Sequence, residues 1–173
     1  WSNADNLVPG DTNGSLDVFV RDRVAGTTEM VSVNSNGTPG TSASHSPSIS
    51  ADGRYVAFYS PSTNLGGGPT GAADIFVRDR QAGTTECVSV STGGIPGDAD
   101  SHAAAISADG RFVAFTSSAT NLVPGDTNGQ RDVFVHDRAT GTTEIVSLGA
   151  GGVQPNGISE GVSISADGRF VAF

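Results

Sequence analysis

The sequence predicts an all-β fold built from repeated four-stranded blades, the architecture called a β-propeller, and three observations lead to this prediction. A motif recurs as SADGRYVAF at 50–58 and as SADGRFVAF at 107–115 and 165–173. The period of 57 and then 58 residues suits a four-stranded blade better than a solenoid coil. Apolar residues come in short runs bounded by Gly, Pro, Asn and Asp, without helical spacing, which is typical of short strands joined by tight turns.

Each repeat predicts four antiparallel strands in chain order. In the second repeat, residues 47–50 form the first strand, and residues 51–53 form a tight turn in which Gly53 takes positive φ. Residues 55–59 then return as the second strand. The third strands are predicted at 17–23, 74–80 and 132–138, with turns after them at Gly26, Gly83 and Gly141. The fourth strands are predicted at 29–33, 86–90 and 144–148.

The patterns within these strands predict where each lies in a blade. The second and third strands carry apolar residues at consecutive positions, VAF and VFV, so both of their faces should be buried between neighbouring blades. The fourth strand, TTEMVSV in the first repeat, alternates apolar and polar residues and should meet solvent on one side.

The repeat units are about 1–58, 59–115 and 116–173, three four-stranded blades per chain, permuted so that one blade is shared between the termini. Three blades cannot close a ring, since propellers have four to eight. We therefore expect self-association through the terminal strands, with residues 169–173 pairing with residues 17–23 of a second copy. The expected product is a homodimeric ring of six blades, and the alternative is an open filament.

The paired motifs S-x-D-G-R-[YF]-V-A-F and D-[VI]-F-V-x-D-R resemble the WD40-like (PD40) repeat of periplasmic TolB-type β-propellers. The resemblance covers all three units. It implies a six-bladed propeller and a role as docking platform, peptidase lid or part of a secreted bacterial protein. No peptidase domain follows the repeats in this sequence.

Composition excludes several classes of partner. The chain has 18 acidic residues against 9 basic ones, so nucleic acid and anionic membranes are poor partners and cations are better ones. No apolar run is long enough to span a membrane.

Cys87 is the only cysteine and therefore cannot form an internal disulfide. Since Met30 and Ile145 occupy its place in the other repeats, we expect Cys87 to be a buried apolar side chain.

The loop before the third strand is the strongest candidate for a metal site. It reads GDTNGSLD at 10–17 and GDTNGQRD at 125–132, and such closely spaced oxygen ligands around a turn suit a hard cation such as Ca²⁺. The second repeat keeps only Asp74, so the last aspartate of each loop should also have a structural role. Asx-turns are the alternative. The candidate ligands are Asp11, Asn13, Asp17, Asp126, Asn128 and Asp132.

Three further patterns have a structural interpretation that we prefer. The third strand of each repeat ends in an acidic and a basic residue, which we interpret as forming turn-closing hydrogen bonds or ion pairs rather than catalytic pairs. These residues are Asp22, Asp79 and Asp137 with Arg23, Arg80 and Arg138. His45, His102 and Glu160 precede the first strands, as solvated loop positions or as a ring at the mouth of a central channel. Residues 157–161 match G-x-S-x-G but lack the strand and helix that a nucleophile elbow needs.

The sequence thus predicts a noncatalytic module, secreted or periplasmic and bacterial, that serves as a self-assembling interaction platform with Ca²⁺ in two loops. One alternative is a lectin-like protein that binds glycans or peptides through calcium. The other is a fragment of the propeller of a larger secreted hydrolase.

Overall fold

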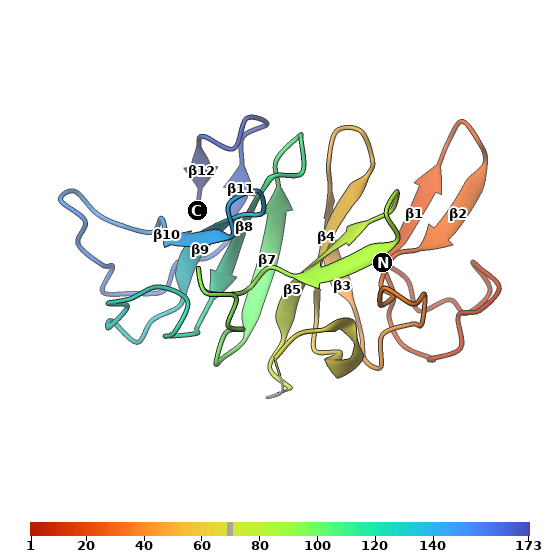
Figure 1. Ribbon diagram of the computed structural model, residues 1–173, viewed down its shortest axis with the longest axis horizontal. Helices are drawn as coiled ribbons and strands as arrows, with labels where there is room; N and C mark the ends of the chain where they lie inside the picture. The colour runs from red at the N-terminus through yellow and green to blue at the C-terminus, as the bar shows by residue number, and fades with distance from the viewer. Residues whose placement is uncertain (69–70) are drawn as a thin grey trace.

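The computed structural model describes residues 1–68 and 71–173, and its regular structure is almost entirely antiparallel β-sheet (Figure 1). The exception among these residues is a single 3-10 turn, η1, at Thr63–Leu65. The strands are β1 Phe19–Asp22, β2 Thr27–Met30, β3 His45–Ile49, β4 Tyr55–Ser60, β5 Asp74–Asp79, β6 Thr84–Cys87, β7 Ser101–Ile106, β8 Phe112–Ser117, β9 Asp132–Asp137, β10 Thr142–Ile145, β11 Ser163–Ile164 and β12 Val171–Ala172. The all-β prediction is confirmed.

The strands form two four-stranded sheets flanked by two two-stranded ones. We call them sheet I (β1–β2), sheet II (β3–β6), sheet III (β7–β10) and sheet IV (β11–β12). Within sheets II and III every strand pairs with the next along the chain. Sheets II and III are complete four-stranded blades, whereas sheet I holds only third and fourth strands and sheet IV only first and second strands.

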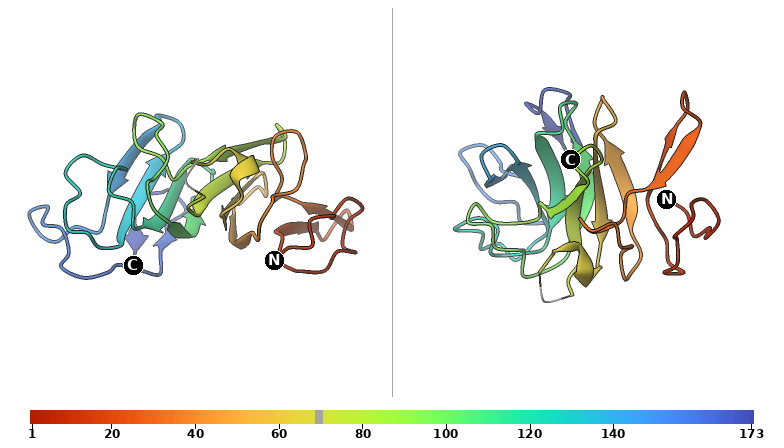
Figure 2. Two further views of the ribbon diagram at one scale, coloured as in Figure 1. Left: turned by 90° about the horizontal axis from the view of Figure 1, so that it is seen from below. Right: turned by 45° about the vertical axis from the view of Figure 1, so that its right-hand side comes forward.

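The sheets stand beside one another in chain order and fan into an open arc (Figure 2). Sheets I and IV lie at its two ends. Among the described residues, no helix is long and apolar enough to cross a membrane.

Some strand limits differ from those predicted. The fourth strands begin and end earlier, at Thr27–Met30, Thr84–Cys87 and Thr142–Ile145. They end early because the serine two residues later turns its hydroxyl toward the aspartate that begins the third strand, as described below. The first strands of sheets II and III begin earlier than predicted, so that His45 and His102 lie inside β3 and β7 rather than before them.

The hydrophobic core lies between the sheets. One cluster joins sheets I and II, with Val18 and Val31 on one side and Phe58 and Phe76 on the other. A second cluster joins sheets II and III through ten buried residues: Ala57, Ile75, Val77, Val88, Ile106, Val113, Phe115, Ala119, Leu122 and Phe134. The central strands β4, β5, β8 and β9 are buried at nearly every position, as their unbroken apolar runs predicted, and the fourth strands alternate.

Glycine in the turn of the second and third motifs, Gly110 and Gly168, permits close approach between sheets. A Cβ at Gly110 would lie 2.1 Å from the ring of Tyr55, which belongs to the preceding sheet. Gly168 meets the ring of Phe112 in the same way, at 2.2 Å. Both glycines also have positive φ, 74° in each case, so the turn and the packing both require glycine.

Gly110→Ala should destabilise the fold more than Gly141→Ala. Both substitutions place a side chain at positive φ, which costs about 1–2 kcal/mol, but a Cβ at Gly141 meets nothing within 4 Å. Overpacking against Tyr55 should add roughly 1–3 kcal/mol at Gly110 alone. Urea unfolding of both variants measures the difference, and equal losses would contradict the interpretation of this contact.

Candidate functional site

A buried aspartate begins the third strand of each repeat and is held by a serine of the fourth strand. Asp17 Oδ1 accepts a hydrogen bond of 2.5 Å from the Ser32 hydroxyl, and that hydroxyl oxygen accepts the backbone N–H of Val18. The same bonds join Asp74 to Ser89 and Asp132 to Ser147, each at 2.7 Å. The three aspartates therefore clamp two strands together in every repeat, with or without a metal.

In the two acidic loops, 10–17 and 125–132, the asparagines form Asx-turns. Asn13 Oδ1 accepts the backbone N–H of Ser15, and Asn128 Oδ1 accepts that of Gln130. Burial and the neighbouring carboxylate of Asp17 or Asp132 raise the pKa of Asp11 and of Asp126 above the ordinary value. Within the described ranges, no three or more His, Cys, Asp or Glu side chains are grouped so that they could hold a metal ion.

Two of the three carboxylates that end the third strands, Asp79 and Asp137, form ion pairs, and their partners are arginines of the repeated motif rather than Arg80 and Arg138. Arg54 of the repeated motif binds Asp79 through two hydrogen bonds of 3.0 and 2.6 Å, and Arg111 binds Asp137 at 2.8 and 2.7 Å. The Arg54 guanidinium lowers the pKa of Asp79 to about 2. A carboxylate held ionised in this way is a poor proton donor near neutral pH.

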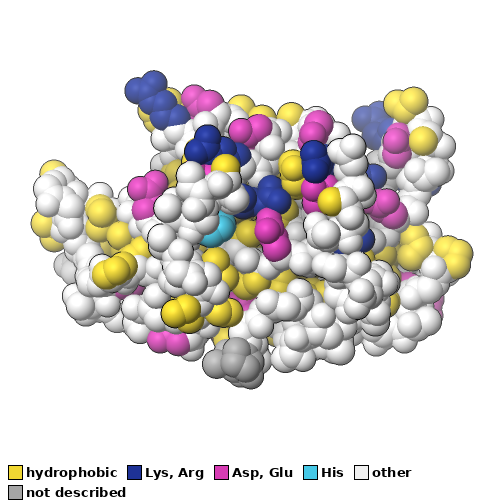
Figure 3. Space-filling model, viewed as in Figure 1, with side chains coloured by type: hydrophobic (Ala, Val, Ile, Leu, Met, Phe, Trp, Pro, Cys, Tyr) yellow, Lys and Arg dark blue, Asp and Glu magenta, His cyan; other side chains and the backbone are white. Residues whose placement is uncertain are grey.

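The predicted arginine partners reach the neighbouring sheet instead. Arg80 binds Glu29 of sheet I, and Arg138 Nε donates to Glu86 of sheet II at 2.6 Å. The arginine and acidic side chains consequently gather near the edge of the arc where the hairpin turns lie (Figure 3). This ladder between sheets was not predicted from the sequence, because its partners are 51 and 52 residues apart and lie in different repeats.

The structure brings His45 and His102 into one row with two aromatic residues that the sequence did not single out. His45 contacts Tyr59 edge to face with ring centroids 4.8 Å apart, and Tyr59 stacks on His102 at 5.1 Å. Trp1 extends the row, 6.3 Å from His45. Glu160, at the equivalent position of the third repeat, instead accepts a hydrogen bond of 2.7 Å from Arg131. Burial lowers the pKa of His102.

A β-bulge follows each histidine. Ser46 and Ala103 have positive φ, 53° and 44°, and the register of pairing shifts at both places. The third repeat carries Gly161 here, with φ of 71°. This glycine was therefore the sequence signal for the bulge, and it explains the second glycine of the G-x-S-x-G match at 157–161 without any nucleophile.

Cys87 and His136 have structural surroundings. Burial raises the pKa of the Cys87 thiol to about 12, so the reactive thiolate does not form near neutral pH. His136 is buried, and its Nδ1 lies 2.8 Å from the Thr143 hydroxyl.

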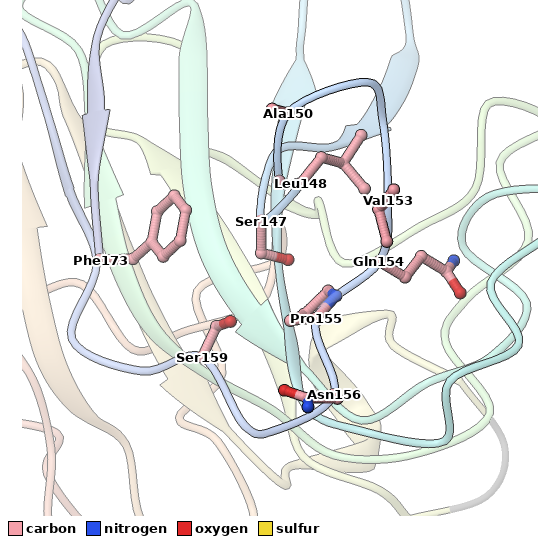
Figure 4. Close-up of a pocket in the computed structure, with 10 residues that line it drawn as sticks. Ser147, Leu148, Ala150, Val153, Gln154, Pro155, Asn156, Ser159 and Phe173 are labelled. Carbon is pink, nitrogen blue, oxygen red and sulfur yellow. The ribbon is translucent and has the colours of Figure 1, made fainter.

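An open pocket of about 530 Å³ lies at the sheet IV end of the arc (Figure 4). Phe173 lines one side of it, and the loop that follows β10 lines the other. The lining residues are Ser147, Leu148, Gly149, Ala150, Val153, Gln154, Pro155, Asn156, Ser159 and Phe173. Its walls are mostly apolar and carry no ionisable side chain, which favours an apolar occupant over a reacting substrate.

Arg54→Gln should reduce the loss of unfolding free energy that occurs as the pH falls below about 4. Because the folded pKa of Asp79, about 2, lies below the ordinary value of 3.8, this pair stabilises the fold above pH 4 and loses that contribution between about pH 4 and 2. The variant should be slightly less stable than the wild type at pH 7, because Arg54 is partly exposed, and should lose less stability than the wild type as pH falls. Urea unfolding at several pH values measures this, with Arg21→Gln as control; a profile parallel to wild type would contradict it.

No protein-family model matches the sequence, and no curated protein matches it. Among solved structures, the chain is similar to TolB from Acinetobacter baumannii, with a TM-score of 0.53, 21% identity, and coverage of 90% of this chain and 31% of that chain. It is also similar to the putative TolB from Agrobacterium tumefaciens, with a TM-score of 0.51, 20% identity, and coverage of 90% and 48%. The chain thus spans about a third to a half of these structures, and the likeness identifies its fold as that of β-propeller blades.

Proposed function

We propose that the chain is a noncatalytic β-propeller module whose end sheets join those of a second copy, forming a platform for protein interaction outside the cytoplasm. The observation that carries the proposal is that the contacts between adjacent sheets recur along the chain. In contrast, residues of sheets I and IV that are equivalent to buried ones of the inner sheets, such as Phe173, are exposed. The proposed interface between two copies therefore repeats the contacts that adjacent sheets make within the chain.

The apolar part of these repeated contacts is the packing of Leu122. Leu122 is 1% exposed and belongs to the same buried cluster as Phe115, which is 0% exposed. The equivalent residues at the chain ends are Leu7, 44% exposed, and Phe173, 56% exposed. Because Phe173 lines the open pocket of Figure 4, that pocket is where Leu7 of a second copy would lie.

The charged part is the ladder of ion pairs. Arg80 binds Glu29 and Arg138 binds Glu86, so the next step would join Arg23 of one copy to Glu144 of the other. None of the ion pairs among the described residues involves Arg23 or Glu144. Arg54–Asp79 and Arg111–Asp137 similarly predict a pair between Arg169 and Asp22 of different copies.

Backbone pairing between strands is the third part of the proposed interface. In sheet II, β4 pairs with β5 along six residues, from Tyr55 with Asp79 to Ser60 with Asp74. The isolated bridge between Ser2 and Asp17 in sheet I matches the last of these pairs. β12 of one copy would supply the remaining pairs to β1 of the other, which would complete a four-stranded blade.

Two such seams would close a six-bladed ring of two chains, and a rotation that fails to close would give a filament. We propose that the chain is noncatalytic because its recurring ionisable side chains form turn hydrogen bonds and ion pairs. The extracytoplasmic location rests on the resemblance of the repeat to the periplasmic TolB type.

Reversing the charge of Asp22 or Arg169 should weaken the association of two copies, and reversing both should restore it. Asp22→Arg or Arg169→Asp alone sets like charges against each other and should raise the dissociation constant of the assembly at least tenfold, about 1.4 kcal/mol. The double variant should restore most of the affinity. Asp22 and Arg169 lie on sheets at opposite ends of the arc, so rescue cannot arise within one chain (Figure 1). Sedimentation velocity measures the mass; a monomeric wild type, or a double variant as weak as the single ones, would contradict the proposal.

Leu7→Asp should also disrupt association, because a carboxylate would enter the apolar pocket beside Phe173. Val24→Asp is the matched control for the pocket, since Val24 is 99% exposed on a hairpin turn and is not among the residues that line the pocket. We expect the control to assemble like the wild type, as measured by light scattering after size exclusion. Equal behaviour of the two variants would exclude this pocket as the docking site.

A further inference from the structure

The two acidic loops have the same spelling over nine residues, NLVPGDTNG at 6–14 and 121–129, yet their hydrogen bonds differ. In the second loop, 125–132, the Asn128 side-chain amide donates to Asp132 Oδ2 at 2.8 Å. Together with the Ser147 hydroxyl on Oδ1, this bond provides a donor for both oxygens of the buried carboxylate. The backbone N–H of Asn128 also donates to Asp126. The second loop thus satisfies its own carboxylates.

In the first loop, 10–17, the corresponding amide is used elsewhere. Asn13 Nδ2 donates to the backbone carbonyl of Gly40 at 2.9 Å, and Ser32 is the donor to Asp17 Oδ1. Asp17 Oδ2 and Asp11 Oδ1 are left buried without any hydrogen-bond partner among the described residues. Asp17 is 0% exposed, so its second oxygen faces the protein interior rather than solvent.

These two oxygens belong to carboxylates that repel each other. Asp17 and Asp5 both raise the pKa of Asp11 by their negative charge, which places the three acidic residues in one electrostatic neighbourhood. In the second loop, Asp98 is the additional acidic neighbour of Asp126. The Asp98 carboxylate already accepts two hydrogen bonds from Thr120, one from its backbone N–H at 2.8 Å and one from its hydroxyl at 3.0 Å. An unpaired buried carboxylate oxygen beside a second one is costly unless a cation or a donor reaches it.

We propose that the first acidic loop binds one hard divalent cation through Asp17 Oδ2 and Asp11 Oδ1, and that the second loop binds none. Carboxylate oxygens are the ligands that Ca²⁺ prefers, and main-chain carbonyls or water would complete its shell. With only two carboxylates as ligands, the dissociation constant should be on the order of 10⁻⁴–10⁻³ M, as in extracellular modules. The inference does not depend on self-association.

Equilibrium dialysis against Ca²⁺ at pH 7 and constant ionic strength tests this in the wild-type chain. We expect one ion per chain at saturation. At about ten times the dissociation constant, the melting temperature should rise by roughly 3–5 °C. Zero ions would overturn the proposal and indicate that a proton or water serves the two oxygens. Two ions would overturn the distinction between the loops.

Asp11→Asn and Asp126→Asn are matched variants at equivalent positions of the two loops. Asp11→Asn should abolish the rise in melting temperature with Ca²⁺, whereas Asp126→Asn should keep it in full. Loss of the rise in both variants would show a general effect of charge, and retention in both would remove Asp11 from the site. Either result would overturn the assignment. Circular dichroism without Ca²⁺ verifies that each variant is folded.

Discussion

The structure depends on one constraint: a sheet whose two central strands are apolar on both faces must be covered on both sides. Sheet II meets this requirement within the chain, because one cluster packs it against sheet I and another packs it against sheet III. A stack of this kind always has two uncovered ends. In sheet IV, Phe170 and Phe173 are exposed, whereas the equivalent Phe115 of sheet III is buried.

The sequence was informative wherever a residue's role follows from its own repeat. The unbroken apolar runs VAF and VFV predicted β4, β5, β8 and β9 and their burial, since a strand without alternation has no face for solvent. Features that depend on two neighbouring sheets were harder. The Arg80–Glu29 pair joins residues 51 positions apart, and the row of His45, Tyr59 and His102 joins three strands. Spacing within one repeat does not reveal such contacts.

The acidic loops define a different limit of sequence reasoning. Because their sequences are identical over nine residues, the two loops received the same prediction. The side-chain amides of Asn13 and Asn128 both donate to an equivalent backbone carbonyl, that of Gly40 or Pro155, but only Asn128 also donates to the buried aspartate of its loop, Asp132. A metal site is set by which oxygens remain without donors, and a motif alone does not specify this.

The repeat also relates stability to association. Because each sheet buries its apolar surface against its neighbours rather than in a core of its own, the energy of covering an end is of the same kind as the energy of folding. The inner contacts, such as those of the cluster that contains Leu122 and Phe115, are buried, whereas surface ion pairs alone contribute little. Under the proposed association, the ladder of arginines and carboxylates would therefore mainly set register and partner choice, and the apolar residues would supply the affinity. A second copy of the chain would present the apolar residue, the charge and the strand edge together, which an unrelated surface would not.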